Sequence, residues 1–140
     1  MSSVENCPFC NMKQRILKEN KNAFLFLSDP RKVPGHFLVS SKRHVEKPWL
    51  LTSDEIKDIF ELVFFTQKRL TEKISKGADV RQNYRPFLKQ STHKIDHVHY
   101  HVIPRDLFDD LYERVEKHET AMFEPLSNAE HDKMAKLIED

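Results

Sequence analysis

Three of the eight histidines in this chain lie within five residues of the segment IDHVHYHVIP, which spans residues 95–104. Alternate side chains of a strand share one face, so His97, His99 and His101 are expected to point to the same side. A row of imidazoles adds little to packing and needs hydrogen-bond partners, which disfavours a purely structural role. Imidazole can act as a general acid or base, a nucleophile or a metal ligand. The segment therefore predicts a reactive or metal-binding site on one face of a strand.

A second group of reactive side chains lies in the segment CPFC at residues 7–10. Two thiolates at this spacing can bind one zinc ion. The same spacing occurs in thiol redox sites, but those follow a strand of a βαβ unit, and no such unit is predicted here. A third interpretation is a pair of inert buried thiols. We favour zinc, for which Cys7 and Cys10 supply two of the four ligands that a closed structural site needs.

Short strands and one long helix must position these residues. Thr52 and Glu55 fit a capping box, and apolar residues then recur at helical spacing until Gly77, which predicts a helix over about 53–76. Apolar runs bounded by turn residues predict strands at 23–28, 36–41, 79–85 and 96–103. Shorter helices are expected at 11–19, 107–120 and 127–139. This order favours an α+β domain with an antiparallel sheet.

The charged residues are distributed unevenly along the chain. Residues 1–105 contain 19 Lys and Arg against 11 Asp and Glu, a balance of +8, whereas residues 106–140 contain 4 against 11, a balance of −7. We therefore expect a domain at 1–105 that carries the histidines and an acidic helical extension of it at 106–140. The positive part suits an anionic ligand such as a phosphate, although an ordinary solvated basic surface would have the same composition.

Length and composition limit the class of protein. A chain of 140 residues suggests one hydrophobic core. No apolar run approaches the ~20 residues that cross a bilayer, and the N-terminal segment MSSVENCPFC lacks the pattern of a signal peptide. We therefore expect no membrane association and a cytoplasmic location, where the two cysteines would not form a structural disulfide.

Three motifs together indicate a family. The segment HVHYHVI at residues 97–103 resembles the signature of the histidine triad (HIT) superfamily of nucleotide hydrolases and transferases. The segment PGHFLVSSKRHV at 34–45 resembles the second marker of that superfamily, and CPFC resembles its zinc-containing branch. The resemblance implies a HIT-like fold with a sheet of about five strands, one long helix and C-terminal helices. It also implies a homodimer, in which Phe64 and Phe65 would be core or dimer contacts.

The resemblance assigns roles to matching positions. His99 corresponds to the nucleophile that takes a nucleoside monophosphate from the substrate, and His101 corresponds to a contact to the phosphate or leaving group. His36 corresponds to a further contact near the α-phosphate, and Asn83 to a polar contact with the substrate. In the zinc-containing branch, the structural metal ligands correspond to Cys7, Cys10, His44 and His97.

The chain departs from the family pattern just before the triad. Many members have Gly-Gln-Ser or Gly-Gln-Thr there, whereas this chain has Thr92, His93 and Lys94. Either His93 and Lys94 supply positive charge in place of that motif, or Gln90 and Ser91 approach the phosphate. The departure leaves the leaving group open: dinucleoside polyphosphates, nucleoside phosphoramidates and adenylylated molecules all present the same α-phosphate to His99.

Three functions therefore remain from the sequence. The first is a nucleotide hydrolase or transferase that forms a covalent nucleotidyl-histidine. The second is a metalloenzyme that uses the three triad histidines as ligands of a catalytic metal. The third is a nucleotide-binding module without turnover. In each case we expect a small molecule rather than a nucleic acid as the ligand. We interpret Trp49 as a packing residue rather than one that stacks on a nucleobase.

Overall fold

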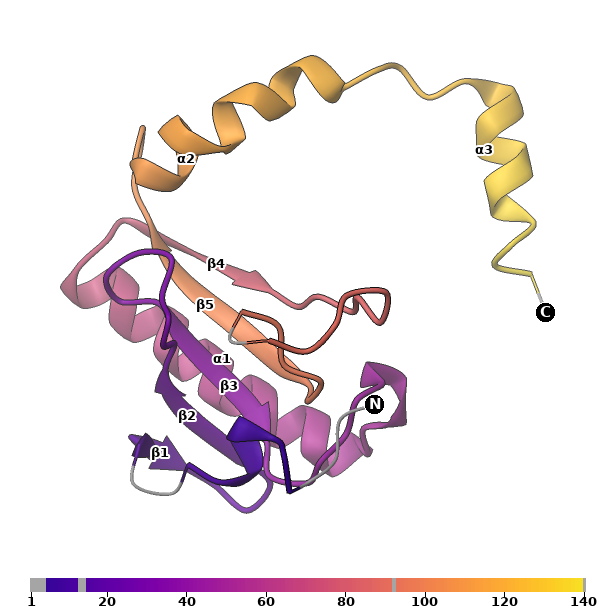
Figure 1. Ribbon diagram of the computed structural model, residues 1–140. Coiled ribbons are helices and arrows are strands. Elements are labelled where there is room, and N and C mark those ends of the chain that lie inside the picture. The colour runs from indigo at the N-terminus through magenta and orange to yellow at the C-terminus, as the bar shows by residue number, and fades with distance from the viewer. Residues whose placement is uncertain (1–4, 13–14, 92, 140) are drawn as a thin grey trace. The chain divides into compact units, whose positions relative to one another are not determined.

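The computed structural model describes residues 5–12, 15–91 and 93–139. The chain divides into two compact units, Met1–Leu107 and Phe108–Asp140. In the first unit the described residues form a five-stranded sheet, one long helix and short 3₁₀ helices (Figure 1). The strands are β1 (Lys18–Glu19), β2 (Ala23–Leu27), β3 (Phe37–Ser41), β4 (Gly77–Arg81) and β5 (His99–Arg105). The helices are η1 (Pro8–Cys10), η3 (Pro48–Leu50) and α1 (Ser53–Lys73).

The sheet confirms the predicted α+β class. Its strand order is β1-β2-β3-β5-β4, and all neighbouring strands are antiparallel. The strand that carries His99 and His101 is the last in sequence, yet it lies between β3 and β4. A strand that is hydrogen-bonded on both sides has a fixed backbone. The histidine side chains therefore project from a rigid part of the sheet.

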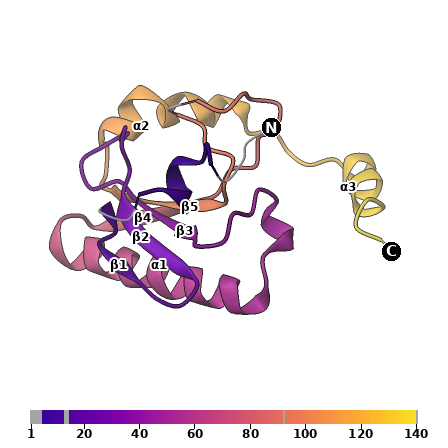
Figure 2. The same ribbon diagram turned by 60° about the horizontal axis from the view of Figure 1, so that its bottom comes forward.

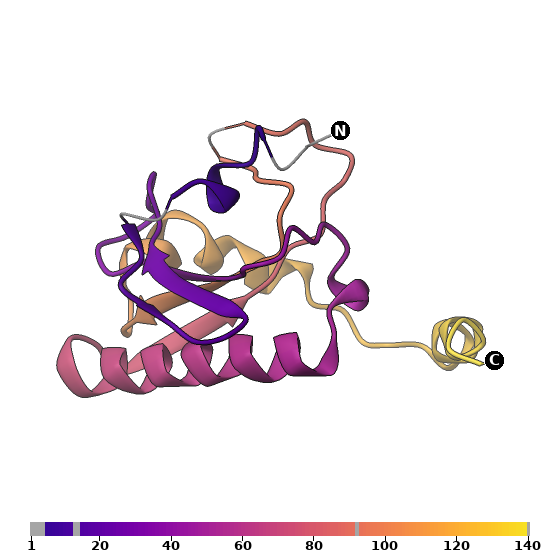
Figure 3. The ribbon, with the colours of Figure 1, turned by 90° about the horizontal axis from the view of Figure 1, so that it is seen from below.

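Helix α1 covers one face of the sheet. The predicted capping box is confirmed: Glu55 N–H donates to Thr52 Oγ1 at 3.1 Å, and Thr52 N–H donates to a Glu55 carboxylate oxygen at 2.9 Å. Figures 2 and 3 show α1 running along the strands on one side only. The larger core cluster lies between them; its buried members include Leu25, Val39, Ile59, Leu62, Val63, Leu70 and Val102.

A second, smaller core lies on the opposite face of the sheet. It consists of Cys7, Phe9, Met12, Phe26 and Leu38, so the N-terminal segment packs against β2 and β3. Figure 3 shows this segment and α1 on opposite sides of the strands. The sheet therefore separates a mainly apolar helix interface from a face that carries cysteines and histidines.

The prediction of a helix over 11–19 is wrong for the described part of that segment. Lys18–Glu19 form β1, which pairs with β2, and Leu17 N–H donates to Leu25 O at 2.8 Å. Pairing with the edge of β2 satisfies these backbone groups and overrides a short local helical pattern. Part of the expected helix, residues 13–14, lies outside the described residues.

The ends of two strands also differ from the expectation. The strand expected at 79–85 runs from Gly77 to Arg81, and the strand expected at 96–103 runs from His99 to Arg105. The register explains the shift: Gly77 at the start of β4 pairs with Arg105 at the end of β5, and β5 begins at His99, which pairs with Ser40 of β3. The chain before β5 stays attached to the domain, because Val98 N–H donates to Val45 O at 2.7 Å.

The second unit contains α2 (Asp110–Arg114), η4 (Glu116–Met122) and α3 (Asn128–Ala135). The helices expected at 107–120 and 127–139 are therefore present but shorter or partly 3₁₀. Asp109 caps α2 and Ser127 caps α3 through side-chain oxygens that accept backbone N–H groups. In the described parts of the chain, no helix is both long and apolar enough to cross a membrane.

The turn before β3 generates a prediction at Gly35, which has a φ of +85°. A Cβ there would lie 2.9 Å from Ile74 Cδ1 and 3.2 Å from Pro104 Cγ. Left-handed backbone costs an L-residue ~1–2 kcal/mol, so Gly35→Ala is expected to lower the free energy of unfolding by at least that amount, measured by urea denaturation.

Gly77→Ala is the matched control, because an added Cβ would meet its nearest atom at an ordinary 3.7 Å. Equal stability of the two variants would contradict the assignment of strain to Gly35.

Candidate functional site

The register places His99 and His101 on the face opposite α1. His101 pairs with Leu38 of β3, which in turn pairs with Phe26 of β2. His99 pairs with Ser40 in the same way. Directly paired residues of antiparallel strands lie on the same face. The two histidines therefore stand beside the side chains that form the smaller core, with Phe9 packed edge-on against His99 at a centroid distance of 5.0 Å.

One hydrogen bond sets the reactive nitrogen of His99. Its Nδ1 lies 2.7 Å from the backbone carbonyl oxygen of His97. A carbonyl oxygen can only accept, so Nδ1 carries the proton and Nε2 keeps its lone pair. Burial lowers the pKa of His99 below its usual range, because it disfavours the imidazolium. His99 is therefore a neutral imidazole with an unprotonated Nε2.

His36 and His101 form a directed pair. The backbone N–H of Lys32 donates to His36 Nδ1 at 3.1 Å, so the proton of His36 is on Nε2. That nitrogen donates to His101 Nδ1 at 2.8 Å, which leaves the proton of His101 on its own Nε2. The bonds form a chain that ends in an N–H donor on His101.

Burial keeps this pair uncharged. It lowers the pKa of His36 to about 4, with the nearby charge of Lys32 as a second cause. Burial and the neighbouring His99 and His36 lower the pKa of His101 to about 3. Both rings are consequently neutral hydrogen-bonding groups at pH 7.

A cavity of about 730 Å³ opens onto these histidines. His36, His99 and His101 line it, and Ser91 and His93 reach it from the loop before β5. Its remaining wall has an apolar part and a charged part. The apolar part includes Pro8, Phe9, Met12, Phe26, Leu27, Leu38 and Ile95, and the charged part consists of Arg15, Asp29, Arg31 and Lys32. Such a cavity suits a flat organic group held beside a polar reacting centre. The structure thus places Ser91 and His93 with the predicted catalytic histidines.

The other two expected substrate contacts line a second cavity beside the triad. This cavity, of about 670 Å³, is lined by Asn83 and Lys94 and also by His97 and His99. Lys94 forms an ion pair with Asp96, so the charge of Lys94 is already compensated. Thr92, from the segment that departs from the family pattern, lies outside the described residues.

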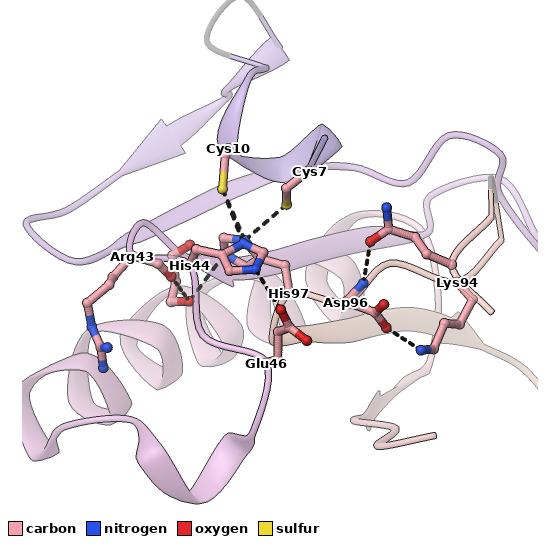
Figure 4. Close-up of polar contacts among 10 residues, drawn as sticks. Cys7, Cys10, Arg43, His44, Glu46, Lys94, Asp96 and His97 are labelled. Atoms are coloured by element: carbon pink, nitrogen blue, oxygen red, sulfur yellow. Dashed lines mark hydrogen bonds and ion pairs between the residues drawn. The ribbon is translucent and has the colours of Figure 1, made fainter. Parts of the chain in front are cut away.

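Four potential metal ligands converge beside the triad. The Sγ atoms of Cys7 and Cys10 lie 3.3 and 3.5 Å from His97 Nδ1, and Cys10 Sγ lies 3.4 Å from His44 Nδ1. All four donor atoms lie within 4.8 Å of one another. Tetrahedral zinc with ordinary Zn–S and Zn–N bonds separates sulfur from nitrogen by about 3.6 Å. Figure 4 shows both sulfur atoms directed toward the His97 ring.

The remaining ring nitrogens orient these ligands. His97 Nε2 donates to the carbonyl oxygen of Ser41 at 2.7 Å, which leaves its Nδ1 lone pair directed at the thiols. His44 Nε2 donates to a Glu46 carboxylate oxygen at 3.1 Å (Figure 4). A ligating histidine that donates its other N–H to a carbonyl or carboxylate is the usual arrangement at metal sites.

The pKa shifts of Cys10 and His97 are also consistent with a bound cation in this cluster. Burial, reinforced by the adjacent Cys7, raises the pKa of the Cys10 thiol to about 12. Burial lowers the pKa of His97 to about 4, which keeps the imidazole neutral as a ligand must be. Thiolate ligands in this cluster therefore need a cation beside them, and the four groups could hold a metal ion.

Two elements bring the ligands together. Cys7 precedes the single turn of η1 and Cys10 is its last residue, and this turn packs on β2 and β3 through Phe9. His44 follows Arg43, whose guanidinium donates to both carboxylate oxygens of Glu55 at 3.0 and 2.8 Å. Because Glu55 caps α1, this pair ties the segment that carries His44 to the helix start.

Several residues of the site were missed from the sequence. The apolar cavity wall of Phe26 and Leu38 was assigned only to strands, although alternation in AFLFL could have placed Phe24 and Phe26 on one face. Glu46 could have been predicted as the carboxylate that accepts a hydrogen bond from His44, because it lies only two residues after it. The backbone N–H of Lys32 and the carbonyl of Ser41 had no signal, because every residue has these groups.

The chain is similar in sequence to known proteins of one family. Residues 10–107 match the HIT domain family profile. A relative from Drosophila melanogaster, the nitrilase and fragile histidine triad fusion protein NitFhit, is 34% identical over 97 residues, which are 69% of this chain and 21% of that protein. The chain thus spans about a fifth of the length of this curated relative.

Solved structures share the fold. A HIT family protein from Bacillus anthracis superposes with a TM-score of 0.73 at 22% identity, covering 97% of this chain and 96% of the other. A zinc-bound histidine triad family protein from Mycobacterium smegmatis has a TM-score of 0.64 at 20% identity, covering 78% and 81%. The Plasmodium falciparum diadenosine triphosphate hydrolase has a TM-score of 0.62 at 22% identity, covering 77% and 74%.

Proposed function

Because the chain belongs to the HIT domain family, we propose that it cleaves a nucleotide substrate at its α-phosphate, with His99 as the nucleophile. The observation that carries this proposal is the bond from His99 Nδ1–H to His97 O, which leaves Nε2 as a neutral nucleophile. That nitrogen belongs to a residue lining a cavity shared with His36 and His101. The fold is also that of a diadenosine triphosphate hydrolase, so it is compatible with this chemistry.

The reaction proceeds in two displacements at phosphorus. In the first, the lone pair of His99 Nε2 forms a bond to the α-phosphorus, and the leaving group departs with the electron pair of the broken bond. In the second, water forms a bond to phosphorus and loses a proton to solvent, while the P–N electron pair returns to His99. If another acceptor replaces water, the same intermediate supports transfer.

His101 and His36 act on the phosphoryl oxygens. The Nε2–H of His101 donates to the charge that develops there, and His36 holds His101 in the tautomer that can donate. Donating a proton to the leaving group is not expected of His101, because its ring is neutral and loss of the Nε2 proton would leave an imidazolate. Ser91 and His93, which line the same cavity, are proposed as substrate contacts, and its apolar wall as the nucleoside site.

The contacts of the triad speak against a catalytic metal held by all three histidines. His97 Nδ1 faces Cys7, His99 Nδ1 is bonded to the His97 carbonyl, and His101 Nδ1 is bonded to His36. Across the described residues, the one group of potential metal ligands that converges is Cys7, Cys10, His44 and His97. We propose that this group binds a structural zinc ion, which would fasten the N-terminal segment to the sheet.

We also propose that two copies of the chain associate through α1 and β4. Gln67 of α1 donates to the carbonyl of Ala78 in β4 at 2.8 Å, so this side of the helix lies next to that strand. Phe64 lies three residues before Gln67 and Ile74 seven residues after it, so the three side chains project from the same side of the helix. The residues Phe64 and Ile74 are both 59% exposed. β4 is an edge strand of the described sheet. An open edge beside exposed apolar side chains suits pairing with a second copy.

We propose a cytoplasmic location for this protein, because cysteines remain free thiols in that compartment.

The nucleophile is tested by three histidine variants. His99→Ala is expected to fall to background on every substrate that the wild type cleaves. His101→Ala should retain measurable turnover, since the loss of an assisting group costs ~10²–10⁴-fold. Mass spectrometry after alkaline quenching should detect a nucleoside monophosphate adduct on every protein that keeps His99 and none on His99→Ala. His131→Ala, in the exposed tail, is the control. Substantial turnover by His99→Ala would falsify the assignment, and turnover without any adduct would contradict the covalent route.

The zinc site is tested by metal content and stability. Cys7→Ser should lose a tightly bound zinc ion, and its melting temperature should fall, because structural zinc contributes ~10–16 kcal/mol of apparent binding energy in small peptides. Chelation of the wild type should produce the same shift. Elemental analysis and thermal melts measure both effects. Full zinc occupancy with an unchanged melting temperature would rule out this ligand.

The proposed association is tested by multi-angle light scattering. The wild type should have the mass of a dimer at micromolar concentration, and Phe64→Glu should move it toward the monomer. Leu17→Glu changes an equally exposed side chain next to the opposite edge strand and should leave the dimer intact. A monomeric wild type, or equal effects of both variants, would disprove this interface.

A further inference from the structure

The orientation of the His99 ring depends on more than its hydrogen bond. The bond from Nδ1–H to the His97 carbonyl sets the tautomer, but a hydrogen bond tolerates a range of angles. The second side-chain dihedral of histidine is also broad and roughly two-fold, so the ring can turn over. Attack in line with the leaving group needs Nε2 held in one direction. Packing against the ring has to supply the remaining restraint.

Two rings pack edge-on against the His99 ring. His101 does so from the same strand, with a centroid distance of 5.1 Å and an interplanar angle of 66°. Phe9 does so from η1, with a centroid distance of 5.0 Å and an interplanar angle of 86°. Phe9 also packs edge-on against the His97 ring at 5.9 Å. The proposed nucleophile therefore has one ring neighbour that comes from outside the sheet.

The Phe9 side chain is itself closely packed. It is only 8% exposed, and its ring lies edge-on against Phe26 of β2 at a centroid distance of 5.2 Å. The smaller core, to which both residues belong, surrounds it on the face of the sheet opposite α1. A displacement of η1 would therefore displace the ring that contacts His99.

The backbone of η1 gives Phe9 little support of its own. The turn closes through Cys10 N–H to Cys7 O at 3.2 Å and Asn11 N–H to Pro8 O at 3.4 Å, both longer than the usual distance of about 2.9–3.0 Å. Phe9 lies between Cys7 and Cys10 in the chain, so a potential metal ligand stands on either side of it. Bonds from both thiols to one metal ion would fix the turn and, with it, the Phe9 ring.

We infer that Phe9 is a positioning residue for His99 and that metal binding by Cys7 and Cys10 holds Phe9 in this role. The inference rests on the proposed function of His99 and adds a task for the metal-binding turn, which aligns the reacting nitrogen as well as fastening the N-terminal segment. Without the Phe9 ring, His99 turns into orientations in which Nδ1–H leaves the His97 carbonyl and Nε2 no longer faces the phosphorus.

The first test observes His99 directly in zinc-loaded protein with ¹⁵N-labelled histidine. Long-range ¹H–¹⁵N spectra distinguish the two neutral tautomers, and the His99 signal is assigned by its absence from His99→Ala. The wild type should carry the proton on Nδ1 alone. Phe9→Leu, which keeps apolar bulk in the smaller core, should show both tautomers while its zinc content stays that of the wild type. A wild-type His99 signal in Phe9→Leu would overturn the inference.

Met12→Ala is the matched control. Met12 belongs to the same core, is also 8% exposed and lines the same cavity, but it has no ring. Its truncation removes more side-chain volume than Phe9→Leu does, and yet His99 should keep the wild-type tautomer. The same mixture of tautomers in both variants would mean that loss of core packing moves His99, and the role of the Phe9 ring would be refuted.

Removal of the metal tests the link to the cysteines. Dialysis of the wild type against a chelator, at a temperature where circular dichroism shows a folded protein, should give the His99 signal of Phe9→Leu. The same treatment of Phe9→Leu should change little, because two changes that act through one contact do not add. Equal further shifts in both proteins, or no shift in the wild type, would refute the link. Unfolding at every temperature would also refute it, because the metal would then support the whole domain.

Kinetics separate positioning from nucleoside binding. Phe9 lines the cavity proposed for the nucleoside, so loss of a mere contact would raise KM alone. Positioning predicts instead that Phe9→Leu lowers kcat by about tenfold to a hundredfold and keeps KM within about threefold. Met12→Ala should raise KM and keep kcat. A raised KM with unchanged kcat in Phe9→Leu would overturn the inference. If the wild type cleaves no nucleotide, the proposed function fails, while the spectra still decide the role of Phe9.

Discussion

The contacts of His97 link the two chemical parts of this protein. Its Nδ1 faces the thiols of Cys7 and Cys10, its Nε2 donates to the carbonyl of Ser41, and its own carbonyl accepts Nδ1–H of His99. One residue thus belongs to the potential metal cluster through its side chain and sets the tautomer of His99 through its backbone. A displacement of His97 would change both the ligand geometry and the hydrogen bond that leaves His99 Nε2 free.

The sheet makes this arrangement possible by separating two kinds of packing. On one face, α1 buries a continuous apolar cluster that needs no polar partners. On the other, the N-terminal segment covers β2 and β3 with Phe9 and Met12, and histidines project beside it. The apolar helix face stabilises the domain, so the second face can hold imidazoles, each of which is oriented by at least one bond to a carbonyl, an amide or another ring.

Burial determines the charge state of this second face. An imidazolium loses solvation energy in an apolar surrounding, and the pKa values of His36, His97 and His101 fall to about 4, 4 and 3. The site therefore offers neutral nucleophilic and hydrogen-bonding groups rather than cations. The positive charges that an anionic ligand would meet lie on exposed side chains around the site. These side chains stay ionised because water solvates them.

The sequence alone determined the features that depend on local chemistry and spacing. The alternation of the triad placed His99 and His101 on one strand face, although His97 lies before β5. CPFC indicated a metal, and Thr52 with Glu55 marked the start of α1. Only the tertiary structure decided which nitrogen of each imidazole is free, because the partners of His97 and His36 are backbone groups that carry no sequence signal. Long-range pairing also turned residues 18–19 into a strand and left Trp49 exposed beside Tyr84. Local patterns specify which groups a segment presents, whereas strand register and packing between distant segments specify what each group meets.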